Sequence, residues 1–146
     1  LRAAAILADA SPQGESTLSS AGRHLGLAFQ LQDDLLSTFG DPLRHGKDPF
    51  SDLREGKQTA LIAYARMTSE WPSIEPIFGS ASLSKEDALR IRDLLRQCGA
   101  EQFVQGLVDE QLRSFYELLS NRASAIPAEV RRVLVDLARQ VEGRQA

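Results

Sequence analysis

Apolar residues recur three and four positions apart along most of the chain, a spacing typical of helices that bury one face. The longest clear run lies at 101–121, and shorter runs lie at 59–69 and 84–98. A further run begins at Pro127. The sequence shows no convincing alternation of apolar and polar residues, which would indicate strands. We therefore predict an all-α fold.

Residues that favour helix ends stand at the boundaries of these runs. Ser84 opens a capping box, and Gly99 is well placed as the C′ residue of the same helix. Ser11, as an N-cap, and Pro12, as the first helical residue, predict the start of another helix. We expect that helix to run to about Thr38, because a glycine and a proline follow soon after it.

The apolar faces also predict what each helix packs against. Gly22 and Gly26 each cost up to about 1 kcal/mol relative to alanine inside a helix, so we expect another helix to pack closely there. In the 59–69 helix, Met67 belongs to a broad apolar face. In the helix after Pro127, the residues expected to face the core are Val130, Val133, Leu134, Leu137 and Val141.

One polar patch interrupts the apolar surface of the helix that ends near Thr38. Its members, which lie within about 100° of one another around the helix, are Gln30, Asp33, Asp34 and Ser37. The residues around the patch are mostly apolar, so the helix should be buried. The two adjacent carboxylates should therefore face a cavity or a cleft rather than open water.

Two ionised carboxylates removed from bulk water repel each other and lose hydration, so they need neighbouring cations. Lys47 and Lys57 follow in a glycine-punctuated connection and can supply positive charge. Ligands that are all oxygen favour Mg²⁺ over softer metals. The pattern predicts a magnesium site flanked by lysines, which is the arrangement that a diphosphate group needs.

These residues carry a resemblance. The run FQLQDD…GD…GK…DLREGKQT is similar to the second aspartate-rich region of the trans-isoprenyl diphosphate synthases, or polyprenyl synthetases. The usual motif is D-D-x-x-D, and Ser37 stands where the third aspartate is expected. The first D-D-x-x-D motif of such enzymes does not occur in the 146 residues. The resemblance therefore implies that residues 1–146 are the C-terminal part of one all-α isoprenoid-synthase-type domain, from a truncated chain.

The resemblance also implies an activity and residue roles. The complete enzyme would be a prenyltransferase that condenses isopentenyl diphosphate with an allylic diphosphate, and it would act as a homodimer. Asp33 and Asp34 would hold Mg²⁺ and act in catalysis. Lys47 would act in catalysis as well, and both Lys47 and Lys57 would contact phosphate oxygens. Gln30 would bind the allylic substrate.

For several other polar and aromatic residues we expect structural rather than catalytic roles. We expect Phe29 to belong to the core and Asp52 to be a turn or cap residue, although the resemblance also allows Asp52 to organise the connection that covers the site. His24 and His45 have no partner at zinc-ligand spacing. Cys98 has no activating histidine pattern nearby, so a buried, unreactive thiol is expected.

Composition narrows the remaining alternatives. A net charge of −3 argues against nonspecific nucleic-acid binding, and no apolar run reaches the roughly 20 residues that a membrane span requires. A single cysteine favours a reducing, cytoplasmic location. A terpene cyclase and a non-catalytic relative that binds diphosphates or pairs with an active subunit remain open; Ser37 supports the second of these.

Overall fold

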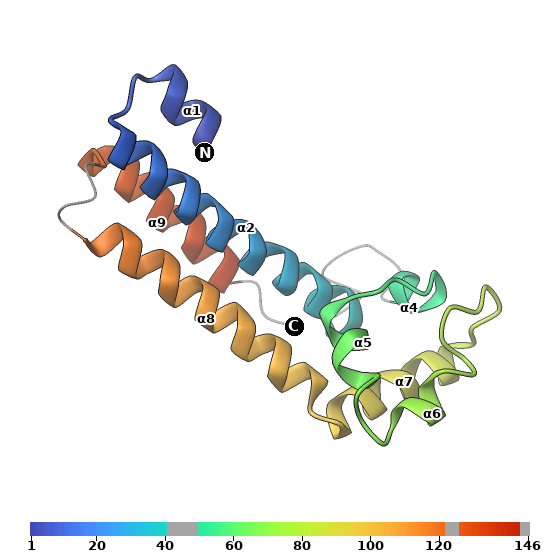
Figure 1. Ribbon diagram of the computed structural model, residues 1–146. Helices are drawn as coiled ribbons and strands as arrows, with labels where there is room; N and C mark the ends of the chain where they lie inside the picture. The colour runs from blue at the N-terminus through green and yellow to red at the C-terminus, as the bar shows by residue number, and fades with distance from the viewer. Residues whose placement is uncertain (41–49, 122–125, 144–146) are drawn as a thin grey trace. The chain divides into compact units, whose positions relative to one another are not determined.

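The computed structural model describes residues 1–40, 50–121 and 126–143, which form helices and turns but no strand. This confirms the prediction of an all-α fold. The helices, labelled in Figure 1, are α1 (Arg2–Leu7), α2 (Pro12–Phe39), α4 (Ser51–Arg54), α5 (Ala60–Ala65), α6 (Trp71–Ile74), α7 (Lys85–Gln97), α8 (Ala100–Ser120) and α9 (Ala128–Glu142). Within the described ranges, no helix is both long enough and apolar enough to cross a membrane.

The first of two compact units contains Leu1–Gln30 and the chain from Leu107 to the end of α9. Polar contacts join its long helices. His24 Nδ1 on α2 lies 2.8 Å from Gln111 Oε1 on α8, and Tyr116 on α8 hydrogen-bonds with Glu142 on α9. The buried apolar residues of this unit include Leu18, Ala21, Ala28, Val108, Leu112, Phe115, Leu119, Leu134, Ala138 and Val141.

The second unit contains Leu31–Gly106, and therefore the last part of α2, helices α4 to α7 and the start of α8. Aromatic contacts tie these segments together. The rings of Tyr64 and Phe103 stack with centroids 4.5 Å apart, and the Arg96 guanidinium lies 5.0 Å from the centre of the Phe39 ring. The buried apolar residues of this unit include Leu35, Phe39, Leu53, Leu61, Ile62, Ile74, Ile91, Leu95 and Val104.

The predicted helix starts are confirmed by side-chain caps. The hydroxyl oxygen of Ser11 accepts a hydrogen bond from the Gly14 amide at 3.1 Å. Ser84 accepts one from the Asp87 amide at 3.0 Å. Such caps satisfy amides that have no partner within the helix, typically stabilising it by about 1 kcal/mol. Gly99 has φ +84°, as expected for the residue that ends α7.

Helix α5 ends earlier than predicted. It stops at Ala65 because the carbonyl of Ala65 accepts hydrogen bonds from both the amide and the hydroxyl of Thr68, at 3.0 and 2.7 Å. Such i to i+3 bonds close the last turn instead of continuing the α-helix. The prediction that Met67 lies on a packed helical face was therefore wrong, and its side chain is exposed.

The prediction of which α9 residues face the core also needs correction. Leu134 and Val141 of α9 are buried as expected, but Val130, Val133 and Leu137 are exposed. The spacing of apolar residues identifies a stripe on a helix, and it does not state how much of that stripe other residues cover.

The two glycines of α2 differ in their surroundings. A methyl group on Gly22 would lie 3.1 Å from the side chain of Leu1, so the close contact there comes from the residue before α1 and not from a helix. Apart from the chain neighbours of Gly26 and the backbone of α2, no atom of the described residues lies within 4 Å of a methyl group placed on Gly26, so the expected close contact is absent at that position.

Candidate functional site

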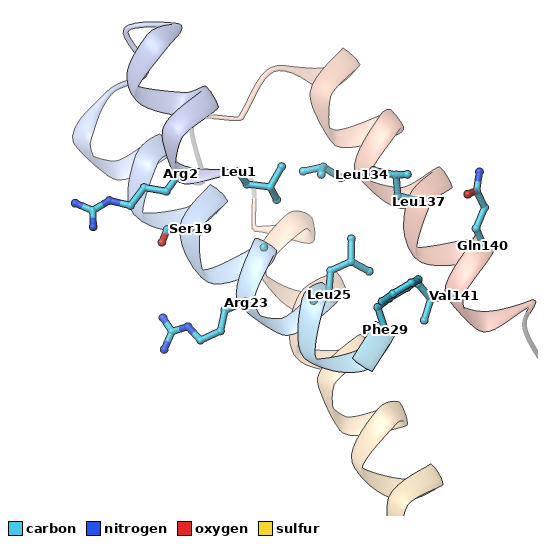
Figure 2. Close-up of a pocket in the computed structure, with 12 residues that line it drawn as sticks. Leu1, Arg2, Ser19, Arg23, Leu25, Phe29, Leu134, Leu137, Gln140 and Val141 are labelled. Atoms are coloured by element: carbon cyan, nitrogen blue, oxygen red, sulfur yellow. The ribbon is translucent and has the colours of Figure 1, made fainter. Parts of the chain in front are cut away.

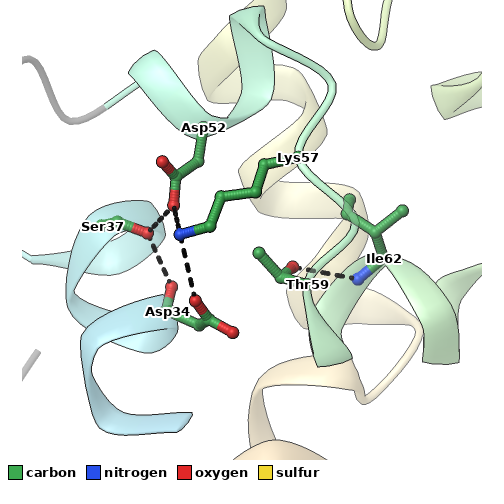
Figure 3. A network of polar contacts seen from close by, with 6 residues as sticks. All are labelled: Asp34, Ser37, Asp52, Lys57, Thr59 and Ile62. Atoms are coloured by element: carbon green, nitrogen blue, oxygen red, sulfur yellow. Dashed lines mark hydrogen bonds and ion pairs between the residues drawn. The ribbon is translucent and has the colours of Figure 1, made fainter. Parts of the chain in front are cut away.

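Four polar residues meet in the second unit, and we call them the Lys57 cluster: Asp34, Ser37, Asp52 and Lys57 (Figure 3). Lys57 Nζ lies 3.0 Å from Asp52 Oδ2 and 3.3 Å from Asp34 Oδ1. Asp34 is buried, so its carboxylate has lost most of its contact with water and requires a cationic partner. Lys57 supplies that positive charge.

Ser37 connects α2 to Asp52. Its Oγ lies 2.7 Å from Asp52 Oδ2 and 3.0 Å from the main-chain oxygen of Asp34. A hydroxyl has one proton, and an ionised carboxylate is a stronger acceptor than a carbonyl. We therefore assign the proton of Ser37 to Asp52 Oδ2, which is also the nearer oxygen. Asp52 Oδ2 thus accepts hydrogen bonds from both Ser37 and Lys57 (Figure 3).

The turn after α4 explains how Lys57 returns to Asp52. Gly56 adopts φ +68°, and the Lys57 amide donates to the Asp52 carbonyl at 2.9 Å. A left-handed glycine followed by a six-to-one hydrogen bond is the Schellman ending of a helix. Lys57 therefore bonds to Asp52 twice, through its amide to the Asp52 carbonyl and through its ammonium to the Asp52 carboxylate. The spacing D-L-R-E-G-K builds this arrangement, because it places a glycine at the C′ position and lysine directly after it.

A second contact holds the same turn in place. The Gly79 amide donates to the Leu53 carbonyl at 2.9 Å. A methyl group on Gly56 would lie 3.1 Å from the Gly79 Cα. The two backbones thus approach so closely that a side chain at residue 56 would force them apart, in addition to straining a positive φ.

The cluster perturbs Lys57. Its hydrogen bond to Asp52 is the largest effect that raises the pKa of the amine above its usual value of 10.5, and the negative charges of Asp52 and Asp34 act in the same direction. Partial burial opposes this shift. Lys57 therefore stays protonated at neutral pH, and the cluster keeps its positive charge.

Lys57 retains capacity to bind another group. An ammonium has three N–H donors, and Asp34 and Asp52 accept two of them within the described residues. The lysine side chain is 40% exposed, so the third donor is accessible from solvent. This is the property required of a lysine that contacts a phosphate oxygen.

The remaining predicted site residues have different positions. Asp33 is half-buried, directly before Asp34 on α2. Gln30 is exposed and is the last residue of the first unit on α2. Lys47 and His45 lie outside the described residues. Phe29 is 44% exposed, so the prediction that it belongs to the core was wrong.

Asp52 makes more contacts in the structure than its sequence position predicted. It was expected to be a turn or cap residue, and the resemblance gave it only a general role in the covering connection. In the structure its side chain makes no cap hydrogen bond for α4 and instead contacts Ser37 and Lys57. The signal that could have identified this pairing is the glycine between Asp52 and Lys57, because a Schellman ending brings these two residues together.

The donor set is compatible with magnesium. In the parts of the chain that the structure describes, no group of three His, Cys, Asp or Glu residues forms a complete metal site. Mg²⁺ in enzymes usually binds one or two carboxylates and takes its other ligands from water and substrate phosphates. Asp33 and Asp34 provide two adjacent carboxylates, which fits a metal bound in this partial way.

The first unit contains an apolar hollow of about 630 Å³ between the first residues of the chain, α2 and α9 (Figure 2). Leu25 and Phe29 of α2 line it, as do Leu134 and Leu137 of α9. Figure 2 shows that the guanidinium group of Arg23 points away from α9. The hollow thus offers apolar side chains to an occupant.

Comparisons with known proteins agree with the all-α fold and with the resemblance to the polyprenyl synthetases. The family model described as polyprenyl synthetase matches residues 1–95. The chain is 31% identical over 133 residues to geranylfarnesyl diphosphate synthase of Aeropyrum pernix, covering 91% of this chain and 41% of that protein. It is 30% identical over 150 residues to (2E,6E)-farnesyl diphosphate synthase of Mycobacterium tuberculosis, covering 97% and 41%.

The chain also resembles solved structures of prenyl and polyprenyl synthases. The geranylgeranyl pyrophosphate synthase of Corynebacterium glutamicum, crystallised with isoprenyl diphosphate and magnesium, superposes with a TM-score of 0.82 at 36% identity. The match covers 94% of this chain and 40% of that one. The polyprenyl synthetase of Streptomyces coelicolor A3(2) gives 0.83 at 30% identity, covering 94% and 43%.

The chain belongs to the polyprenyl synthetase family. It spans about two fifths of the length of the farnesyl and geranylfarnesyl diphosphate synthases that it matches.

Proposed function

We propose that this chain supplies the second acidic motif of a trans-prenyltransferase that condenses isopentenyl diphosphate with an allylic diphosphate. The observation that carries the proposal is the Lys57 cluster, in which the buried carboxylate of Asp34, the residue after Asp33 on α2, meets the ammonium of a partly exposed lysine. The names of the relatives favour chain elongation over the cyclase and non-catalytic alternatives.

Each predicted site residue would have its own role in this reaction. Asp33 and Asp34 would hold a magnesium ion, which when bound supplies positive charge to the diphosphate. Lys57, with one donor available, would contact a phosphate oxygen, and Lys47 would do the same. Gln30 would orient the allylic substrate. Fixed positive charge stabilises the charge that develops on a leaving group, so the protein needs no nucleophile.

The proposed reaction has three steps. The bond between the allylic carbon and its diphosphate oxygen breaks, and both bonding electrons leave with the diphosphate. The double bond of isopentenyl diphosphate then attacks the allylic cation and forms the new carbon–carbon bond. The resulting cation loses a proton to the departed diphosphate, which restores a double bond. Lys57 and Lys47 would act mainly in the first step, where negative charge on the leaving group grows.

The length of the relatives sets an expectation for the chain on its own. No D-D-x-x-D motif occurs in the 146 residues, whereas the family pattern includes one before the second acidic motif. The 146 residues would then be the C-terminal part of one all-α domain, and we expect them to be inactive alone. The homodimer and the cytoplasmic location stay predictions.

The test is prenyl transfer by the intact natural protein with magnesium, isopentenyl diphosphate and an allylic primer. Asp33→Ala should lower turnover by at least about 10²-fold, because it removes a charge that holds the metal where leaving-group charge develops. Asp136→Ala is the matched control, since Asp136 forms an exposed pair with Arg139 on α9. A near-wild-type rate for Asp33→Ala would rule out its role.

A further inference from the structure

Residue 37 departs from the family motif, and the structure shows what the departure does. A hydroxyl stands where the motif has a carboxylate, and it donates to the Asp52 side chain at 2.7 Å. We propose that Ser37 is a positioning residue: it holds the Asp52 carboxylate on α2 so that Lys57 is fixed between Asp52 and Asp34. Its effect on turnover rests on the proposed function, whereas the contact itself does not.

The contact depends on the hydroxyl proton. Asp52 Oδ2 accepts from Ser37 Oγ at 2.7 Å and from Lys57 Nζ at 3.0 Å. An alanine at residue 37 has no proton to donate, and among the described residues Asp52 Oδ2 would keep only its bond from Lys57. The Asp52 side chain is only 16% exposed, so water replaces the lost bond incompletely. The serine therefore holds a carboxylate from α4 against α2.

The hydroxyl directs the carboxylate without being needed to dock α4. That four-residue helix is anchored by buried Phe50 and Leu53, and by the bond from the Gly79 amide to the Leu53 carbonyl. These contacts remain when the hydroxyl is removed. The variant should therefore still fold, and its Asp52 and Lys57 side chains should lose their fixed orientation.

The experiment compares variants of the intact natural protein in the prenyl-transfer assay. Ser37→Ala should lower kcat by about tenfold or more, since hydrogen bonds to charged groups are worth that factor. The KM for isopentenyl diphosphate should not change. Ser37→Thr keeps the hydroxyl and should behave like the wild type.

Urea unfolding provides a readout that does not need turnover. In a double-mutant cycle of Ser37→Ala and Asp52→Ala, the two changes in unfolding free energy should be non-additive, because the residues are in contact. Additive effects would overturn the inference. So would a Ser37→Ala variant as active as the wild type, or a Ser37→Thr variant no better than Ser37→Ala.

The two proposals fail in different ways. If the wild-type protein shows no prenyl transfer, the proposed function fails, and the unfolding cycle still decides whether Ser37 holds Asp52. If Asp33→Ala abolishes turnover and the Ser37 variants have no effect, only the role of Ser37 is overturned.

Discussion

Helix α2 takes part in two regions with opposite character. In the second unit, its carboxylate at Asp34 is buried, and Lys57 neutralises it. In the first unit, Leu27 and Phe29 of the same helix are each 44% exposed. The second unit buries a charged group, and the first unit leaves apolar side chains in contact with water.

The difference shows which features this chain specifies by itself. A buried carboxylate without partners would be costly, and the chain supplies the partners from a glycine-shaped turn close in sequence. An exposed leucine is tolerated without a partner, so the hollow in the first unit does not define its occupant. The Lys57 cluster is therefore the better basis for a functional conclusion.

The largest expected effect distinguishes covered from uncovered residues in the first unit. Leu134 is 2% exposed and its neighbour Val133 is 56% exposed on α9. Leu134→Ala should lower the free energy of unfolding by about 2–5 kcal/mol, because it leaves a cavity in the core. Val133→Ala should change it by at most about 0.5 kcal/mol. Urea unfolding measures both. Equal losses would mean that Val133 is packed as well as Leu134. The first unit would then not leave apolar residues of α9 exposed.

The next effect concerns the turn that builds the cluster. Gly56→Ala should lower the free energy of unfolding by about 1–2 kcal/mol or more, because residue 56 has φ +68° and its new methyl would lie 3.1 Å from Gly79 Cα. Gly26→Ala is the matched control, since Gly26 is helical and, beyond α2 itself, no atom of the described residues lies within 4 Å of the added methyl. Gly26→Ala should raise the free energy of unfolding by up to about 1 kcal/mol. Thermal unfolding checks the two signs; a Gly56→Ala variant as stable as the wild type would contradict the described turn.

The smallest effect is the pH dependence of the cluster. Asp52 raises the pKa of Lys57 in the folded protein, so the folded state favours the charged amine. The stabilisation is complete below the unfolded pKa of about 10.5 and is lost as pH rises through the folded pKa. The stability difference between wild type and Lys57→Gln should therefore shrink above about pH 10. It should be modest because the lysine is partly exposed to solvent.

Comparing the two proteins over the same pH range removes the contribution of other groups that titrate there. Tyr116 is one such group, since burial raises the pKa of its hydroxyl. A constant difference from pH 8 to about pH 11 would show that Lys57 does not interact with the carboxylates when the protein is folded.

The sequence predicted most of the helices because their signals are local. Ser11 and Ser84 mark helix starts through bonds to amides three residues later, and Gly99 marks an end through its own conformation. The pairing of Asp33 and Asp34 on one helix also follows from adjacent positions. These features need no knowledge of distant segments.

Other features depend on contacts between segments that periodicity does not report. The bond between Ser37 and Asp52 joins residues 15 positions apart, and no helical spacing relates them. The exposure of Val133 and Leu137 depends on what lies across from α9, and their spacing alone resembles that of core residues. Phe29 was misassigned for the same reason.

The central claim is that the acids of α2 and Lys57 bind a magnesium-bound diphosphate. Calorimetric titration of inorganic pyrophosphate into the intact natural protein, with and without Mg²⁺, tests it most directly. The account predicts magnesium-dependent binding that Asp33→Ala and Lys57→Gln each weaken by about tenfold or more and Asp136→Ala leaves unchanged. Binding of equal strength in all four proteins, or binding indifferent to magnesium, would contradict it.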